Sequence, residues 1–320
     1  MKNHKKKLLT ASILITSSAA IMYMINKMIS ASAVIKNLLS STEDNYYDWK
    51  FGKIYYKKSG QGSPLLLIHD LNVCGNDQEW SKVLHALEKK HTVYTLDLLG
   101  CGRSDKPEIT YTNFLYVQLI TDFVKDIIKR KTNVIASGLS TSFTIMTCLN
   151  DNTVFDKLML ISPEDLAVLN QIPTKQSKIS KFILEIPILG TLIYNIIVNK
   201  PNTELLFTEK YLFNPFHMEQ KMVDTYFEAS HRKNGKYLQS SIKGHYVYTN
   251  VAHALKEINN SIFIVSGEKM DRIEENIALY QSLNSSIESE LIPKTKMMPH
   301  LEAPEKVLEI IDMYFFTEEA

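Results

Sequence analysis

Short apolar runs alternate with longer amphipathic stretches from residue 50 onward. The most regular runs are residues 64–68 (PLLLI), 92–96 (TVYTL), 133–136 (NVIA), 157–161 (KLMLI) and 261–265 (SIFIV). Each run is too short for a helix and carries no polar alternation, which is typical of strands buried on both faces. The stretches between them have helical spacing. The pattern therefore predicts an α/β fold with a mainly parallel central sheet and helices on both faces.

The alternation stops between about residues 165 and 258, where the chain has almost only helical patterns. Weaker signals on either side add a first strand at 54–56, a late strand at 286–292 and a final helix at 304–314. An all-helical insertion between two strands of a parallel sheet predicts a lid over the carboxyl ends of the strands, where open α/β sheets bind ligands. We therefore expect one domain over residues 49–320, with a helical lid at about 165–258.

The amino terminus has a different pattern. Residues 8–25 carry no charge and follow a cluster of lysines, Lys2 and Lys5 to Lys7. The run approaches the ~20 residues that cross a bilayer. We predict a basic stub and single-pass membrane anchor at 1–35, followed by a polar linker at 36–48. Because the lysines precede the apolar run, the positive-inside rule places the amino terminus in the cytoplasm and the main domain outside it.

Two alternatives to the anchor are open. Ala31, Ser32 and Ala33 would fit the cleavage site of a secretory signal peptide. The length of the apolar run and the interrupting Lys27 favour an uncleaved anchor. A buried core helix is the other alternative, although a first element that follows a lysine cluster has no evident core to enter.

Composition narrows the function further. The chain is 45% hydrophobic and 22% charged, and its net charge is +1, so no global field favours nucleic acid as a partner. Its three cysteines form no CxxC pair, and the chain has no phosphate-binding glycine loop and no cluster of metal-ligand residues. We therefore expect no cofactor and no metal.

One turn has the residues of a nucleophile. The segment 133–142 (NVIASGLSTS) predicts a strand, a tight turn and a helix, with Gly138-Leu139-Ser140-Thr141-Ser142 at the turn. This fits the nucleophile elbow G-x-S-x-G, in which the serine hydroxyl projects at the top of a sheet. Ser142 stands where the motif has its last glycine. The alternative is a serine-rich helix cap without chemistry.

Two further segments carry a family resemblance. His69 and Asp70 follow one predicted strand, and residues 97–107 (DLLGCGRSDKP) follow the next. Over about residues 50–315 the chain resembles the α/β-hydrolase family, which has a strand ending in His-Gly and a later D-x-x-G-x-G-x-S-D-x-P. The resemblance implies an oxyanion hole made by the backbone N–H groups of Thr141 and of a residue near Leu71. Asp70 replaces the usual glycine and brings a carboxylate to that loop.

The resemblance also implies an acid and a base, and here the chain departs from the family. Asp271 stands one residue beyond the G-x-x-D position, which Met270 occupies; Glu268 and Asp165 are the alternative carboxylates. Residues 299–304 (PHLEAP) match the family's segment after the catalytic histidine, but Met297 stands where that histidine belongs. Methionine cannot transfer a proton. His300 is then the candidate base, unless it is a structural histidine.

Two functions follow from these patterns. The first is a membrane-anchored serine hydrolase of a small or lipid-like ester, with Ser140 as nucleophile, Asp271 as acid, His300 as base, and Leu71 and Thr141 as oxyanion donors. The second is a catalytically inactive hydrolase-fold protein that binds a ligand or partner at the membrane surface. Ser140 favours the first function. Asp70, Met297 and the displaced Asp271 favour the second.

Overall fold

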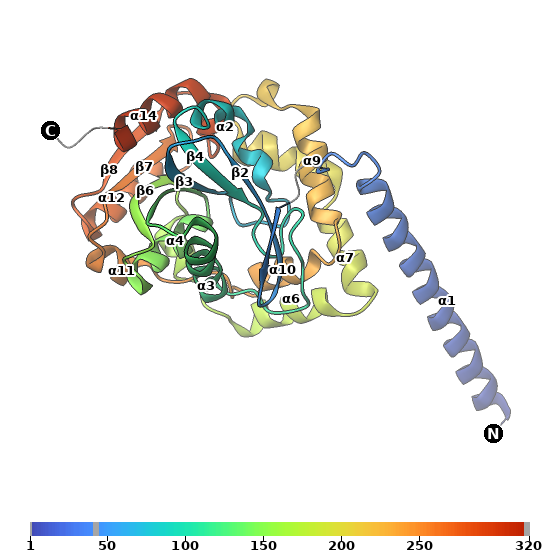
Figure 1. The fold of residues 1–320 in the computed structure, drawn as a ribbon. Coiled ribbons are helices and arrows are strands. Elements are labelled where there is room, and N and C mark those ends of the chain that lie inside the picture. Colours follow the sequence, from blue (N-terminus) through green and yellow to red (C-terminus); the bar gives the residue numbers. More distant parts are fainter. Residues whose placement is uncertain (1, 41–44, 317–320) are drawn as a thin grey trace.

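The central element is one twisted sheet, seen in a computed structural model that describes residues 2–40 and 45–316 (Figure 1). The described residues form eight strands in the order β1-β2-β4-β3-β5-β6-β7-β8. The strands are β1 (Asn45–Trp49), β2 (Gly52–Ser59), β3 (Ser63–Ile68), β4 (His91–Leu96), β5 (Thr132–Ser137), β6 (Phe155–Ile161), β7 (Ile262–Gly267) and β8 (Glu288–Ile292). β1 pairs antiparallel with β2, and β2 with β4, whereas all other neighbours are parallel.

The predicted α/β fold is therefore confirmed. β1 was not expected: it begins at Asn45, inside the segment interpreted as a polar linker, and only Trp49 of its five residues is buried, as on an edge strand. The parallel register sets Ile68 beside Ala136 and Ile161 beside Val265. The carboxyl ends of β3, β5, β6 and β7 thus lie along one edge of the sheet, which is where the candidate site forms.

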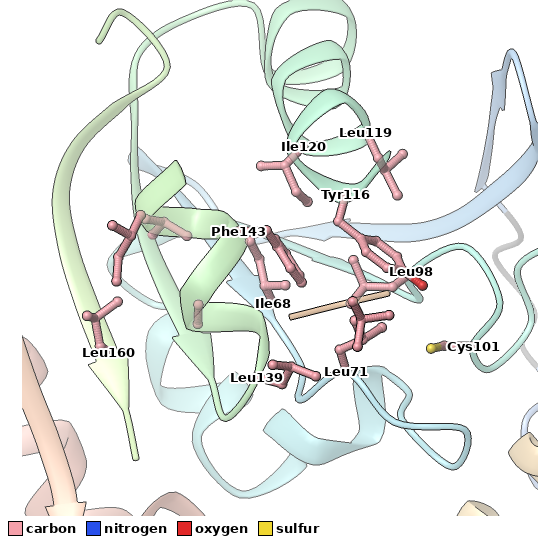
Figure 2. Close-up of a cluster of buried hydrophobic side chains, with 14 of the residues drawn as sticks. Ile68, Leu71, Leu98, Cys101, Tyr116, Leu119, Ile120, Leu139, Phe143 and Leu160 are labelled. Carbon is pink, nitrogen blue, oxygen red and sulfur yellow. The ribbon is translucent and has the colours of Figure 1, made fainter. Parts of the chain in front are cut away.

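Helices cover both faces of the sheet. One face packs against α2 (Ser81–Leu87) and α14 (Pro304–Phe316) through an apolar cluster that includes Trp80, Val83 and Ile311. The other face packs against a larger cluster, part of which Figure 2 shows around Phe143 and Tyr116. The helices on this second face are α3 (Asn113–Phe123) with its continuation η2 (Val124–Ile128), α4 (Ser140–Asn150), α11 (Ala252–Glu257) and α12 (Ile273–Leu283).

Every regular element between β6 and β7 is a helix. This helical insertion comprises α5 (Leu166–Leu169), α6 (Lys175–Glu185), α7 (Leu189–Ile197), α8 (Lys200–Leu205), η3 (Leu206–Tyr211), η4 (Pro215–His217), α9 (Gln220–His231), α10 (Lys236–Lys243) and α11. Its aromatic residues Tyr194, Phe207, Tyr211 and Tyr226 are each at most 3% exposed and join the large cluster. They are core residues, so they pack the insertion onto the sheet instead of lining an open channel.

The first helix, α1 (Lys2–Ala33), extends away from the rest of the molecule (Figure 1). Its residues 12–33 have a mean hydropathy of 1.3 and are long and apolar enough to cross a membrane, a test that a signal sequence also passes. The end of α1 nearest the body is fixed by polar contacts. Asn26 Nδ2 donates to the Ile188 carbonyl at 2.9 Å, and Asn195 Nδ2 donates to Asn26 Oδ1 at 2.9 Å.

Candidate functional site

The sharp turn between β5 and α4 is centred on Gly138. β5 ends at Ser137, α4 begins at Ser140, and Gly138 between them has a left-handed φ of 55°. Glycine adopts this conformation without steric cost, which explains its place here. In an elbow, the nucleophile is the residue held at the strained point between strand and helix. Gly138 occupies that point, two residues before Ser140.

The position of Gly138 faces two residues that the sequence had marked as departures from the family pattern. A Cβ atom added to Gly138 would lie 2.9 Å from Met297 Cε and 2.2 Å from Asp70 Oδ1. A side chain at position 138 would therefore point at Met297, which stands where the family has its histidine. Gly138 and Met297 therefore lie next to each other beyond the end of β5.

The Asp70 carboxylate lies directly in front of this turn. Its Oδ1 accepts a hydrogen bond from the Leu139 N–H at 2.8 Å, and its Oδ2 accepts one from Asn72 Nδ2 at 3.0 Å. Asp70 is 4% exposed, and burial raises the pKa of its carboxyl, opposed by the charge of Lys210. The Asp70 N–H in turn donates to Glu79 Oε2 at 3.0 Å. The carboxylate is thus held against the backbone donor that follows the turn.

Ser140 lies in the first turn of α4 and is fully buried. Its hydroxyl donates to the backbone carbonyl of His69 at 2.5 Å. This bond ties the helix α4 to the loop after β3. It also takes up the proton that a general base would have to remove, and a backbone carbonyl cannot act as that base.

His300 is also fully buried, on α13 (Pro299–Glu302). Its ring stacks on Trp80 at a centroid distance of 4.7 Å, and its Nε2 lies 3.5 Å from Glu79 Oε1. Burial raises the pKa of the Glu79 carboxyl, but the neighbouring His300 and His69 outweigh burial and lower it. Among the described residues, neither ring nitrogen of His300 is hydrogen-bonded to Ser140 or Asp271.

The candidate acids lie apart from His300. Asp271 is exposed after β7, in a loop in which the Met270 N–H donates to the Gly267 carbonyl. Glu268 is also on this loop, 3.2 Å from Lys269 Nζ. Asp165 caps α5 by accepting the Ala167 N–H at 2.6 Å. The described structure therefore does not bring Ser140, Asp271 and His300 into one hydrogen-bonded chain, and their catalytic roles stay predictions.

The two predicted oxyanion donors differ in environment. The Thr141 N–H points along the helix and bonds to the Gly138 carbonyl at 3.2 Å. Leu71 is buried in the loop after β3, beside Asp70. The N–H of the residue after the turn is that of Leu139, and this donor is the one that Asp70 occupies. The role of Leu71 and Thr141 as oxyanion donors is likewise still a prediction.

A cavity of about 290 Å³ opens beside Met297 at this edge of the sheet. It separates the helical insertion from the loops after β7 and β8. Lys296 Nζ crosses to the insertion and donates to the Glu209 carbonyl at 2.8 Å. The lining residues are Glu209, Lys210, Lys269, Met270, Asp271, Lys296 and Met297. The cavity thus has two methionines, three lysines and two carboxylate residues, so it combines an apolar part with a small excess of positive charge.

The sequence pattern centred the elbow on Ser140, whereas the residue with a left-handed φ between β5 and α4 is Gly138, two residues earlier. The pattern G-x-S-x-G can be read with Gly138 as its first residue or, two residues earlier, with Gly138 at the serine position. The distinguishing signal is the residue that tolerates a left-handed φ: in this segment it is glycine. Counting from the end of the apolar strand at Ser137 would also have pointed to Gly138.

Comparisons with known proteins agree with this architecture. No known family profile matches the chain. A stretch of 72 residues is 35% identical to 2-hydroxy-6-oxo-6-(2'-aminophenyl)hexa-2,4-dienoic acid hydrolase of Metapseudomonas resinovorans, covering 22% of this chain and 24% of that protein. A stretch of 107 residues is 27% identical to an uncharacterized protein of Mycobacterium tuberculosis, covering 33% and 31% of the two chains. The chain thus spans about a quarter to a third of the length of these curated relatives.

Solved structures match over far more of the chain. A serine hydrolase involved in carbazole degradation superposes with a TM-score of 0.71 at 14% identity, covering 86% of this chain and 99% of that one. The carboxylesterase CesB of Bacillus subtilis gives 0.68 at 15% identity over 94% and 99%. The epoxide hydrolase CorEH gives 0.69 at 17% identity over 85% and 98%. With the sheet order and the strand-to-helix turn described above, these likenesses identify the chain as a protein of the α/β-hydrolase fold.

Proposed function

We propose that this protein is a membrane-anchored member of the α/β-hydrolase fold that binds a small or lipid-like ligand without hydrolysing it. The proposal rests on which residues stand at the turn after β5. Gly138 faces Met297, and the Asp70 carboxylate accepts a hydrogen bond from the Leu139 N–H. Acyl transfer needs a nucleophile, a proton acceptor and a free pair of oxyanion donors. At this turn Gly138 stands in place of the nucleophile and Met297 in place of the proton acceptor. One backbone donor, the Leu139 N–H, is already bonded to Asp70.

The ligand would occupy the cavity beside Met297, with the helical insertion acting as its lid. Met270 and Met297 provide a deformable apolar part of its wall, and Lys210 provides positive charge. A medium-chain fatty acid has both features, so decanoate is a suitable probe. Its binding would raise the melting temperature of the purified protein, because a ligand that binds the folded state stabilises it.

The decisive experiment is labelling of the detergent-solubilised full chain with a fluorophosphonate probe, beside Ser140→Ala. We expect folded wild-type protein to stay unlabelled, because the Ser140 hydroxyl is buried and bonded to a carbonyl. Labelling of wild type that disappears in Ser140→Ala would overturn the proposal. It would show that Ser140 leaves the His69 carbonyl and acquires a base.

The second candidate is that serine hydrolase, acting on a small or lipid-like ester. The local likeness to a hydrolase of Metapseudomonas resinovorans favours it, as does the position of Ser140 one turn from the strand end. Its base would be His300, which would have to leave Trp80 and Glu79. Loss of labelling in both Ser140→Ala and His300→Ala would support this candidate.

For the anchor, the contacts of Asn26 favour retention of α1 over cleavage after Ala33. Cleavage would remove the Asn26 side chain from between Ile188 and Asn195, leaving buried polar groups of the insertion unpaired. The lysines before the apolar run favour an extracytoplasmic main domain. Mass spectrometry of the mature chain tests retention, alkaline extraction of membranes tests anchoring, and protease treatment of intact cells tests the side.

A further inference from the structure

A second and larger cavity, of about 550 Å³, lies where α1 meets the helical insertion. Its wall comes from four places: Tyr23, Asn26 and Lys27 on α1, the turn between α6 and α7 at Ile188, the turn between α9 and α10, and Glu108 in the loop between β4 and α3. In Figure 1 this junction lies where α1 leaves the body, beside α7 and α9. The cavity is remote from the turn after β5, so the site described above does not account for it.

Positive charge dominates the wall of this cavity. Lys27, Lys233 and Lys236 line it, against the single carboxylate of Glu108. Lys233 is paired with Asp105 at 2.8 Å, but Lys236 is only 8% exposed and its Nζ has the Glu185 and Ile186 carbonyls as neighbours, at 3.5 and 3.4 Å. Among the described residues, no carboxylate lies within ion-pair distance of Lys236. The direct neighbours of this ammonium are neutral carbonyls, and Glu108 and Glu185 act on it only from beyond ion-pair distance, so it is well placed to bind an anion.

His231 adds a different kind of partner. Its ring lines the cavity and is 3% exposed. Nδ1 lies 2.8 Å from Ser230 Oγ and 3.0 Å from the Phe227 carbonyl. Because the Ser230 hydroxyl already donates to that carbonyl at 2.7 Å, a proton on Nδ1 satisfies both neighbours, and in this tautomer Nε2 is an acceptor. Within the described part of the chain, Nε2 has no hydrogen-bond partner. The cavity therefore offers ammonium groups for an anion and an unused acceptor for a hydroxyl donor.

The surface around the cavity carries many exposed large apolar side chains, which are uncommon on the surface of a soluble protein. α6 and α7 meet at 107° at the turn that lines the cavity. Their outer side chains are strongly exposed: Ile179 58%, Phe182 67%, Ile183 38%, Leu189 41%, Ile196 62% and Ile197 39%. On α1, Tyr23 and Met24 are 51% and 62% exposed. This patch is continuous with the candidate span, and such patches mark contact with an apolar environment.

From these observations we infer that the cavity between α1 and the helical insertion binds the headgroup of an anionic phospholipid. The phosphate would lie against Lys27 and Lys236, a headgroup hydroxyl would donate to His231, and the acyl chains would continue along the exposed apolar residues of α1 and α7. A phosphoglycerol headgroup has both the charge and the hydroxyl donors. The inference rests on the proposed anchoring, because it requires this junction to lie at the bilayer surface.

The test uses the purified full chain in a neutral maltoside detergent, where α1 is already solubilised. The melting temperature is followed while dihexanoyl-phosphatidylglycerol is added, with dihexanoyl-phosphatidylcholine and glycerol 1-phosphate as parallel titrations. We expect only phosphatidylglycerol to raise the melting temperature. Lys27→Met and Lys236→Met should each weaken its apparent affinity at least about tenfold, the effect of one charge-assisted contact. Lys89→Met, an exposed lysine on the far side of the sheet, is the matched control.

Each other outcome overturns the inference. An equal shift with glycerol 1-phosphate would mean that a free phosphate ester binds without its acyl chains. An equal shift with phosphatidylcholine would mean that charge is not recognised. An unchanged affinity in the exposed-site variant Lys27→Met, which is expected to fold, would place the lipid elsewhere. Failure of the anchoring proposal is read separately, by release of the protein in alkaline extraction, and does not enter this titration.

Discussion

The Asp70 carboxylate accepts a hydrogen bond from the Leu139 backbone N–H at 2.8 Å, in a turn that the α/β-hydrolase fold uses for catalysis. The contact joins the loop after β3 to the start of α4. Under the proposed function, this carboxylate fills the place where a hydrolase would stabilise a transient oxyanion. An acid at this position therefore opposes acyl transfer twice, by occupying the donor and by repelling negative charge.

The buried Asp70 carboxyl predicts a pH-dependent stability. Its pKa is raised in the folded state, mainly by burial, above the ordinary value of 3.8. The folded chain then binds more protons than the unfolded chain in this window, so the contribution of Asp70 is most favourable below pH 3.8 and declines as pH rises toward the raised pKa. Asp70→Asn should remove this decline. Urea unfolding of both proteins from pH 4 to 8 measures it as a difference, which should grow with pH.

We predict that adding a single methyl group at Gly138 strongly destabilises the folded protein. In Gly138→Ala the new Cβ would sit 2.2 Å from Asp70 Oδ1 and the residue would have to keep a φ of 55°. We expect a loss of about 2–4 kcal/mol in the free energy of unfolding, combining backbone strain and steric overlap. Asp70→Gly in the same chain should recover part of it. Equal losses in the single and double variants would mean that the two residues do not meet.

The parallel strands were predictable because each is a short, continuous apolar run, such as residues 64–68. Such a run is the sequence signature of a strand that is buried on both faces. β1 was missed because an edge strand that is largely exposed to solvent has no continuous apolar run. The site was harder for a different reason. Motif matching located the segment around Ser140, whereas the left-handed turn is centred on Gly138, which only the glycine itself and the end of the apolar strand indicate in the sequence. The partners of His300 were also not predictable from the sequence, because Trp80 and Glu79 are more than 200 residues away along the chain and meet it only in the folded structure.

Lys106 predicts a second pH effect, of opposite sign. It is buried, its Nζ donates to the Ala229 carbonyl at 2.6 Å, and burial lowers its pKa to about 8 from the ordinary 10.5. Between these values the unfolded chain binds more protons, so stability rises with pH. The stability of wild type relative to Lys106→Met should increase by about 3 kcal/mol from pH 7 to 11. A flat difference would show that Lys106 is solvated in the folded protein.

Arg103 predicts a strong dependence of stability on one buried charge. Its guanidinium pairs with Asp97, at 2.7 Å, and with Asp77, and all three side chains are at most 4% exposed. Removing it in Arg103→Ala leaves the buried Asp97 carboxylate without its ion-pair partner, while Asp77 keeps Lys57 at 2.9 Å, and should cost about 3–5 kcal/mol in urea unfolding. The matched control is Arg272→Ala, whose ion pair with Glu275 is exposed to solvent and should leave the free energy of unfolding almost unchanged.

The strongest test of the register is to rebuild the catalytic positions. If Gly138 stands at the nucleophile position and faces Met297, then Gly138→Ser with Met297→His should bring a hydroxyl and an imidazole together. Asp70→Gly is needed as well, because a Cβ at 138 overlaps its carboxylate and because the Leu139 donor must be freed. We expect this triple variant to react with a fluorophosphonate probe, and Met270→Asp to raise the rate further by orienting the imidazole.

The control for this reconstruction keeps every substitution except the nucleophile. The double variant Asp70→Gly with Met297→His retains Ser140 and lacks only Gly138→Ser, so it should remain unlabelled. Labelling of the double variant would mean that the new imidazole reaches Ser140, and the elbow would then be centred there, as the motif alone suggested. Labelling confined to variants with Ser at position 138 would fix the nucleophile position two residues earlier. The native protein would then lack the nucleophile, the base and a free oxyanion donor at one turn, and binding without turnover would be the function that its residues allow.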